Sequence, residues 1–306
     1  MDINFANMSD LNRTVSAAFR EALAAAPVPE WQKLATRMPS SSASNLYPFF
    51  NETDGMREWF GDAIFDQLAS TRYAIENRKF QKGLTMFRDQ IVDDQDGGAG
   101  LYSGQAAVVA RACASHPDEL VIAETLAAGE TLLCHDGQPM FDNSHPNQND
   151  DGNTQDNLLE GGGTAWYIFD TSKALKPLIY QPREELVLDP QFDLANEVVF
   201  TQHKFRYNAW MRDAAGFGPW FTAVKSKATL DEAGFVAARE RLEGFHLGIK
   251  DPLTGTYRPA RSRAALLVVP RSLRDTARKL ITQGVLTSGE ENYLKDTIGI
   301  HVSEYL

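Results

Sequence analysis

The sequence has few cysteines, no long hydrophobic run and no secretory signal, and each shortage excludes a class of protein. Only Cys113 and Cys134 occur among 306 residues, too few for a disulfide framework and without the CxxC spacing of redox or zinc sites. The longest apolar stretches, such as AALLVV, fall far below the roughly 18 residues of a membrane span. The N-terminus lacks a basic region followed by an apolar one. We therefore expect reduced cysteines, no membrane contact and a chain made in the cytoplasm.

Acidic residues outnumber basic ones, and the excess is local. The net charge is −11, and residues 93–156 hold twelve Asp or Glu against Arg111 alone. This balance argues against the basic footprint of a sequence-specific nucleic-acid binder. Residues 258–279 are the exception, with seven basic residues facing only Asp275. We interpret that stretch as a solvated or intersubunit charge surface.

The first third of the chain alternates between periodic and irregular segments. Val15, Phe19 and Leu23 recur at four-residue spacing, which predicts a helix from about residue 12 that stops before Pro27. Residues 29–51 have the composition of an extended arm, and 56–70 favour a short helix. Residues 71–94 alternate as a two-stranded hairpin with its tip near residues 82–83. Its apolar content is thin, so we expect it to lean on a neighbour.

Further along, helix and strand patterns are interleaved, which is typical of an α+β fold. Strong helix formers fill residues 101–128, where Pro117 predicts a kink or a restart with Asp118 in a new first turn. The stretch 134–163 has the composition of a loop, and WYIFD, PLIY and EVVFTQHKF predict strands up to about residue 224. Thr229 and Glu232 form a capping box before a helix. A buried strand ALLVVP, a helix closed by Gly284 and a final strand complete the chain.

Candidate chemistry is scattered and incomplete. One acidic loop has four side chains of types that bind metal ions: His135, Asp136, Asp142 and His145. Their spacing matches no closed metal site, so we interpret the loop as turns built from DG and HP. A hydrolytic set is conceivable but has no GxSxG elbow; it would use Asp170, Thr171, Ser172 and His203. GGAG and EGGG lack the context of a phosphate cradle. We assign no catalytic, cofactor-binding or metal-binding residue.

Several short segments, read in order along nearly the whole chain, resemble the Mu-like prophage major head subunit family, the gene T product. They are REWFGDAIFDQL, TRYAIENRKF, HPDELVIAETLAAG with CHDGQPMFDNSHP, WYIFDTSKALKPLIYQPRE, FRYNAWMRDAAGFGPWFTAVKSKATL and LLVVPRSLRDTARKLI. Each is weak alone, whereas the DGQ-x-x-FD-x-x-HP and KPLI-x-Q-x-R runs are specific in combination. One departure is Gln81, where the family usually shows an acidic residue.

The resemblance implies the tailed-phage major capsid fold of the Hong Kong type. Residues 1–55 would form the N-terminal arm and helix, 56–95 the extended loop, 96–227 the peripheral domain and 228–306 the axial domain with a returning strand. Within the peripheral domain we expect a spine helix at 101–128, a linker at 147–163 and a β segment at 164–224. This order looks permuted, so we expect Leu306 within about 25 Å of Trp166.

The implied function is structural. Copies would assemble in the host cytoplasm into an icosahedral shell of hexamers and pentamers, the virion head, around double-stranded DNA and without sequence-specific binding. The implied partners are a scaffold and maturation protease, a portal and a decoration protein. The scaffold is expected to be a separate protein, because the matching region leaves no room for a fused scaffold. No enzyme activity and no cofactor are expected. Two rival hypotheses remain: an encapsulin-like compartment, and a metal-dependent hydrolase using the loop of residues 135–145.

Overall fold

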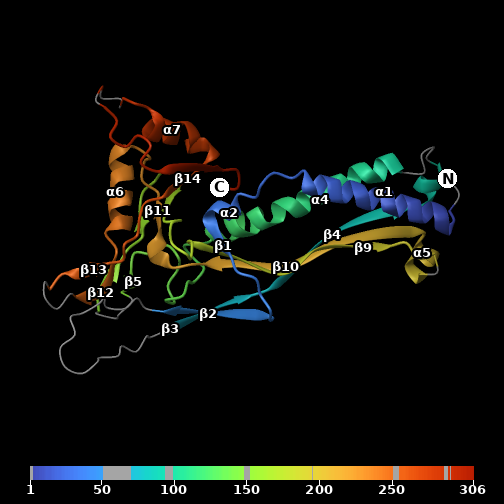
Figure 1. Cartoon of the computed structure of the whole chain (residues 1–306), viewed down its shortest axis with the longest axis horizontal. Helices are drawn as coiled ribbons and strands as arrows, with labels where there is room; N and C mark the ends of the chain where they lie inside the picture. The colour runs from blue at the N-terminus through green and yellow to red at the C-terminus, as the bar shows by residue number, and fades with distance from the viewer. Residues whose placement is uncertain are drawn as a thin grey trace.

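The molecule is elongated and built around two β-sheets that lie end to end (Figure 1). The computed structural model describes residues 3–50, 70–93, 99–147, 152–194, 196–250, 255–285, 289 and 291–306. A four-stranded sheet carries two long helices along one face, and a five-stranded sheet packs against two shorter helices at the other end. The expected α+β class is confirmed. Among the described residues, no helix has both the length and the apolar character to cross a bilayer.

The four-stranded sheet forms the long half of the molecule. Its order is β1 (Ala35–Arg37), β9 (Leu178–Gln191), β10 (Lys204–Phe217) and β4 (Arg78–Phe87). Alternate residues of β10 are buried under the helices α1 (Phe5–Ala24) and α4 (Ala99–Asp118), as the period of two in a strand requires; they are Phe205, Tyr207 and Ala209. Helix and sheet side chains thus share one core.

Helix α1 begins earlier than the sequence pattern predicts. The Oδ1 of Asn4 accepts a hydrogen bond from the backbone N–H of Asn7 at 2.9 Å, so the cap lies at Asn4 and not near residue 12. The helix buries Met8 and Leu11 as well as the expected Val15 and Phe19. It ends at Ala24, before Pro27 as expected.

The expected spine helix is present, but it does not restart after its proline. Pro117 lies within α4, and the chain continues directly into a π-helix, η1 (Glu119–Leu126). A wider turn suits this place because proline lacks the N–H that a regular turn would use. Asp118 consequently lies inside a continuous helix, and the prediction of a new first turn there is wrong. Its carboxylate instead accepts a hydrogen bond from Trp31 at the start of α2 (Trp31–Leu34).

The predicted hairpin over residues 71–94 is wrong. Strand β3 (Ser70–Glu76) pairs with β2 (Ser44–Phe50), whereas β4 pairs with β10, and Gly83 stands mid-strand opposite Asn208. The alternation was correct for each strand, but an alternating pattern does not encode which strands pair. We call β2 and β3 the β2–β3 ribbon. The short helix expected at 56–70 lies, but for Ser70, outside the described residues.

The five-stranded sheet is assembled from distant parts of the chain. Its order is β15 (Gly299–Ser303), β14 (Leu266–Pro270), β8 (Trp166–Phe169), β11 (Ala223–Ser226) and β7 (Leu158–Leu159). The β segment expected at 164–224 is therefore divided between two sheets, and the chain leaves this sheet after β8 and returns at β11. Residues 147–163, expected as a linker, contribute the edge strand β7.

The helices α6 (Glu232–Glu243) and α7 (Arg274–Thr282) pack on this sheet. Helix α6 buries the expected stripe of Phe235, Ala238 and Leu242. Its cap is Asp231, whose Oδ1 accepts from the N–H of Gly234 at 2.8 Å, so the predicted Thr229 capping box is wrong. The expected strand before Pro270 and the helix ending before Gly284 are both confirmed.

Short elements complete the fold. The segment EVVFTQ, expected as a strand, forms the helix α5 (Glu197–Gln202), which buries Val199 against the core of the long half. The other described elements are α3 (Arg88–Asp93), β5 (His145–Pro146), β6 (Thr154–Gln155), β12 (His246–Lys250), β13 (Tyr257–Pro259), η2 (Trp220–Thr222) and η3 (Arg271–Leu273).

The C-terminus lies close to β8, as expected. Only β14 separates β15 from β8, a distance of about 10 Å. The chain beyond Val302 reaches at most ~14 Å further to Leu306, and both Leu306 and Trp166 belong to the same core. Leu306 is therefore within about 25 Å of Trp166.

Candidate functional site

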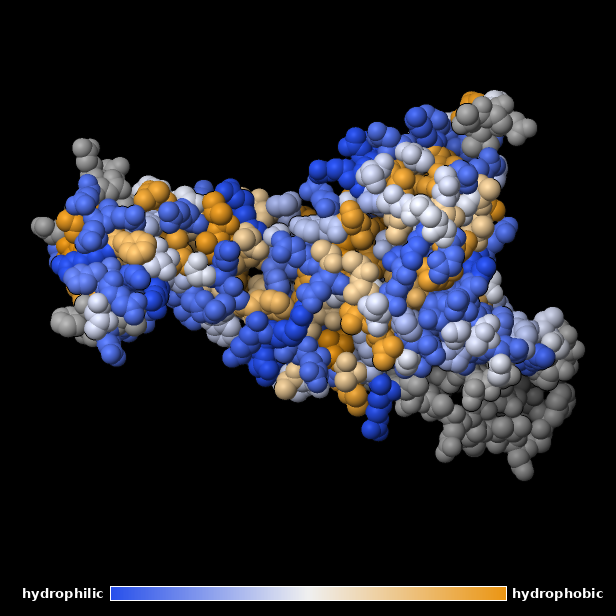
Figure 2. Space-filling model, turned by 180° about the vertical axis from the view of Figure 1, so that it is seen from behind, coloured by the Kyte–Doolittle hydropathy of each residue, from blue (hydrophilic) through white to orange (hydrophobic). Residues whose placement is uncertain are grey.

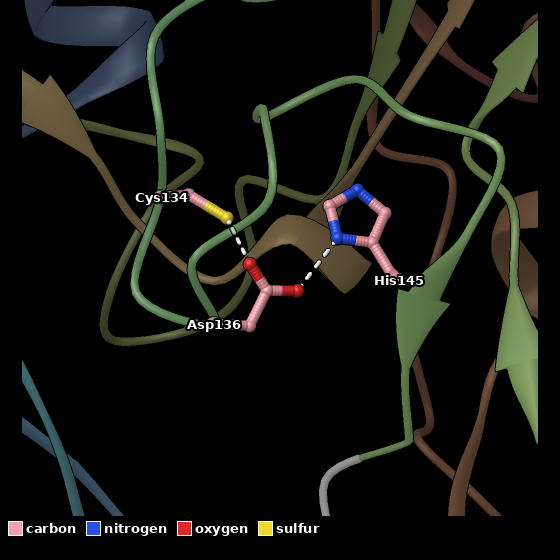
Figure 3. A group of neighbouring side chains, drawn as sticks. All are labelled: Cys134, Asp136 and His145. Carbon is pink, nitrogen blue, oxygen red and sulfur yellow. Dashed lines mark hydrogen bonds and ion pairs between the residues drawn. The ribbon is translucent and has the colours of Figure 1, made fainter. Parts of the chain in front are cut away.

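Three side chains from the acidic loop, Cys134, Asp136 and His145, lie together, and we call them the Cys–Asp–His cluster. The Oδ2 of Asp136 lies 2.7 Å from Nδ1 of His145, the first residue of β5. The other oxygen, Oδ1, accepts a hydrogen bond from the Cys134 thiol at 2.9 Å and one from the N–H of Gln138 at 3.0 Å. Figure 3 shows the carboxylate standing between the sulfur and the imidazole ring. Both carboxylate oxygens are therefore occupied.

Burial sets the electrostatics of this cluster. His145 is fully buried, and its ring stacks on Trp220 with centroids 4.4 Å apart. Burial and the nearby charge of Asp136 raise the pKa of the Cys134 thiol far above its usual value, so the thiol stays protonated. For Asp136, burial acts to raise the pKa, but the bond to His145 and its charge outweigh it and the net shift is downward. A protonated buried thiol is a poor nucleophile and a poor metal ligand.

The structure brings together only part of the predicted metal set. The ligand atoms of Cys134, Asp136 and His145 all lie within 4.8 Å of one another. Asp142 is directed elsewhere, since its Oδ1 accepts from the N–H of Ser144 at 2.8 Å. Burial lowers the pKa of His135 to about 4, so that ring is neutral in the fold. Cys134 was missed, although its position two residues before Asp136 was a usable signal. Thiol, carboxylate and imidazole are donors that suit zinc, but their mutual hydrogen bonds already join residues 134–145 into one closed loop.

The conceivable hydrolytic set is not assembled. The Oγ of Ser172 donates to Oδ1 of Asp170 at 2.5 Å, and Oδ2 of Asp170 accepts from the N–H of Arg263. These contacts close a turn at the end of β8, with Thr171 between them. His203 immediately precedes the first residue of the 14-residue strand β10, and its Nδ1 lies 3.4 Å from a guanidinium nitrogen of Arg88. The hydroxyl therefore has no imidazole base from His203.

Large apolar side chains are exposed on several projecting parts of the molecule. Phe5 is 84% exposed on α1, Leu46 is 54% exposed on the β2–β3 ribbon, and Val108 is 58% exposed on α4. Figure 2 shows hydrophobic residues in several patches along the elongated half. Patches spread over projecting elements are typical of a subunit that is covered by neighbours.

Three acids of the stretch 93–156 are neutralised by bases from elsewhere in the chain. Glu124 pairs with Arg78 at 2.6 Å, and Glu130 lies 2.6 Å from both Lys225 and Lys227. Asp156 pairs with Arg241. The bases that pair with these three acids thus come from outside the stretch, in which Arg111 is the only Lys or Arg.

Comparison with solved structures defines the class of the protein. The structure titled "Procapsid of bacteriophage JBD30 computed in I4 symmetry" has a TM-score of 0.78 and 33% sequence identity, covering 99% of this chain and 100% of that one. The structure titled "Bacteriophage JBD30 capsid" has a TM-score of 0.77 at 24% identity, covering 94% and 93% of the two chains, and supports the fold alone. The fold is that of a phage major capsid protein.

Sequence relatives define the family. The model of the Mu-like prophage major head subunit gpT family matches residues 8–306. The Mu-like prophage FluMu major head subunit of Haemophilus influenzae is 33% identical over 272 residues, covering 86% of this chain and 84% of that one. The major capsid protein of Escherichia phage Mu is 32% identical over 295 residues, covering 90% and 91%. The chain belongs to the Mu-like prophage major head subunit family and is a structural protein of the phage head.

Proposed function

We propose that copies of this chain close into an icosahedral shell of hexamers and pentamers that encloses double-stranded DNA without sequence-specific contacts. The β2–β3 ribbon carries this proposal. Its two strands hydrogen-bond with each other and belong to neither large sheet. A two-stranded ribbon is marginal in water, so beyond the contacts at its base the ribbon gains stability when a neighbouring copy covers it.

The base of the ribbon is anchored to its own subunit. Tyr47 donates from its hydroxyl to Oε1 of Gln181 at 2.5 Å. The Nε2 of Gln181 in turn donates to the carbonyl of Ile75 at 3.1 Å and to Oδ1 of Asn77 at 2.8 Å. Buried Tyr47 and Ile75 pack on Ile179 and Ala214 of the long sheet. A fixed base with an exposed Leu46 gives the ribbon a defined direction in which to meet the next subunit.

We assign the two halves of the molecule to the two parts of a capsomer subunit. The five-stranded sheet with α6 and α7 forms the axial domain, and the four-stranded sheet with α1 and α4 forms the peripheral domain. The β2–β3 ribbon takes the role of the extended loop that the sequence placed at 56–95. This assignment puts β8 and β11 in the axial domain and keeps the permuted order, because axial strands flank the peripheral strands β9 and β10 in the chain.

The remaining partners and absences follow from the same role. A separate scaffold and maturation protease, a portal and a decoration protein would complete the particle. The chain would need no cofactor and no catalysis, because its cluster of Cys134, Asp136 and His145 serves to fix a loop. Family membership favours a phage head over an encapsulin-like compartment. The protonated thiol of Cys134 and the bond of the Asp142 carboxylate to Ser144 disfavour a metal-dependent hydrolase that uses the loop of residues 135–145.

Co-expression with a scaffold protein from a related prophage tests the proposal. We expect the chain to sediment as large closed particles that negative-stain microscopy shows as shells of uniform diameter. A chain that stays monomeric at about 34 kDa with its scaffold present would contradict the proposal.

A further inference from the structure

Helix α7 presents a basic face on which its own subunit pairs two of four bases. It buries Ala277, Leu280 and Ile281 against the core. Its other side and the preceding turn expose four bases: Arg271, Arg274, Arg278 and Lys279. Arg271 pairs with Glu304 and Arg274 with Asp275. Within the part of the chain that the structure describes, Arg278 and Lys279 make no ion pair.

A groove beside α6 of the same half contains an unmatched carboxylate. It has a volume of 560 Å³ and lies between the last turns of α6 and residues 154–156. Two acids line it, Glu240 and Asp156, and Asp156 is already paired with Arg241. Glu240 is exposed and makes no ion pair among the described residues. The groove therefore has an unmatched carboxylate on a concave surface, whereas α7 has unmatched cations on a convex one.

The two surfaces belong to different sides of one domain. Helix α6 packs against β11 and β8, whereas α7 packs against β15 and β14 at the other edge of the sheet. Figure 1 shows α6 standing along one end of the molecule and α7 lying across its top. Contact between two different surfaces of identical subunits is heterologous, and such contacts close into rings when the rotation allows. Opposite charges then fix the register and disfavour wrong pairings.

We propose that the basic face of α7 docks into the groove beside α6 of the next copy around a capsomer, with Arg278 and Lys279 opposite Glu240. The occupant is a second copy of this chain, because the complementary charge is on the chain itself. This inference rests on the proposed shell function. Packaged DNA is the competing occupant of a basic face, but two of its four exposed bases are already paired and the whole chain carries a net charge of −11.

A charge exchange tests the contact. We expect Arg278→Glu with Lys279→Glu to lower the yield of particles at least about tenfold, as the loss of a few charge-assisted contacts repeated around a ring would do. Glu240→Lys alone should do the same. Combining Arg278→Glu and Lys279→Glu with Glu240→Lys should restore particles, because the opposite charges meet again. The matched control, Arg278→Lys with Lys279→Arg, keeps the charge and should assemble like the wild type.

Particle yield is read on a density gradient, and circular dichroism of the unassembled subunits verifies that each variant folds. Wild-type yield from both charge-reversal variants overturns the proposal. Failure of the exchanged variant to assemble, although it folds, overturns the pairing of α7 with α6. Full shells that lose only their DNA would assign the basic face to DNA and overturn the proposal as well. Absence of particles from the wild-type chain would instead overturn the shell function and this contact with it.

Discussion

The backbone N–H of Trp31 donates a hydrogen bond of 2.7 Å to Oδ1 of Asp118, 87 positions along the chain. Nearby, Nε2 of His301 lies 3.1 Å from Oε2 of Glu30. The N-terminal segment, the spine helix and the C-terminal strand thus meet at one junction between the two halves. Burial raises the pKa of Asp118, although its hydrogen bonds act in the opposite direction.

Removing the Asp118 carboxylate should weaken this junction. Asp118→Ala leaves the N–H of Trp31 without its partner, and we expect the free energy of unfolding to fall by about 1–3 kcal/mol. Asp118→Asn keeps an acceptor and should cost less. Urea unfolding of the unassembled subunit measures both, with Glu119→Gln on the exposed neighbour as the control.

The pH dependence of that pair has a definite sign. A pKa raised in the folded state means that Asp118 contributes stability below its unfolded pKa and loses that contribution as the pH rises through the folded value. The free energy of unfolding of Asp118→Asn should therefore rise relative to that of the wild type as the pH increases from acid to neutral. Equal losses for Asp118→Asn and Asp118→Ala at every pH would contradict this account.

His135 should make the subunit sensitive to acid. Burial lowers its pKa to about 4, below the unfolded value of about 6.5. Its contribution to stability is therefore present above the unfolded pKa and is lost as the pH falls from about 6.5 towards 4. His135→Gln should reduce the pH dependence of the free energy of unfolding over that range. The control His203→Asn, at an exposed histidine with positive φ, should leave that pH dependence unchanged. An unchanged acid slope in His135→Gln would refute the assignment.

Two glycines should respond in opposite directions to alanine. A Cβ on Gly218 would overlap the carbonyl oxygen of Lys176, whereas one on Gly104 meets nothing within 4 Å. Gly104 lies inside α4, so Gly104→Ala should raise the free energy of unfolding by about 1 kcal/mol. Gly218→Ala should lower it by about 1–3 kcal/mol. Thermal melts of the two variants measure the contrast, and shifts of the same sign would count against the fold.

The β2–β3 ribbon should separate folding from assembly. Ile75 is 4% exposed and Leu46 is 54% exposed. Ile75→Ser should lower the free energy of unfolding by at least about 2 kcal/mol. Leu46→Ser should leave the subunit's unfolding unchanged but reduce the yield of shells. If Leu46→Ser assembles normally, the ribbon does not use this side chain to contact a neighbour.

Local patterns allowed much of the fold to be predicted, and the errors concern long-range pairing. The buried stripe of α6 follows from apolar spacing within one segment, and the spine helix follows from a run of strong helix formers. Which partner β4 takes depends on β10, more than a hundred residues away, so the hairpin prediction joined two strands that only follow each other in sequence. EVVF has β-branched residues typical of a strand, yet the segment forms a helix that buries Val199 in the core of the long half.

The candidate site was harder to predict, because its contacts join separate segments. Asp136 and His145 were recognised by residue type, but their hydrogen bond and the part of Cys134 depend on how the loop closes. The pairing of the acidic stretch could not be predicted for the same reason, since Lys225 and Lys227 approach Glu130 only in the fold. A surface that contacts other copies is hard to recognise in one sequence, because an apolar residue such as Leu46 is seen to be exposed only in the structure.

Electron cryo-microscopy of assembled particles, at a resolution that traces the backbone, tests the central claim most directly. We predict closed shells in which the β2–β3 ribbon of each subunit lies across the body of an adjacent copy. Particles in which the ribbon contacts only its own subunit, or a preparation that contains no closed shell, would contradict the account.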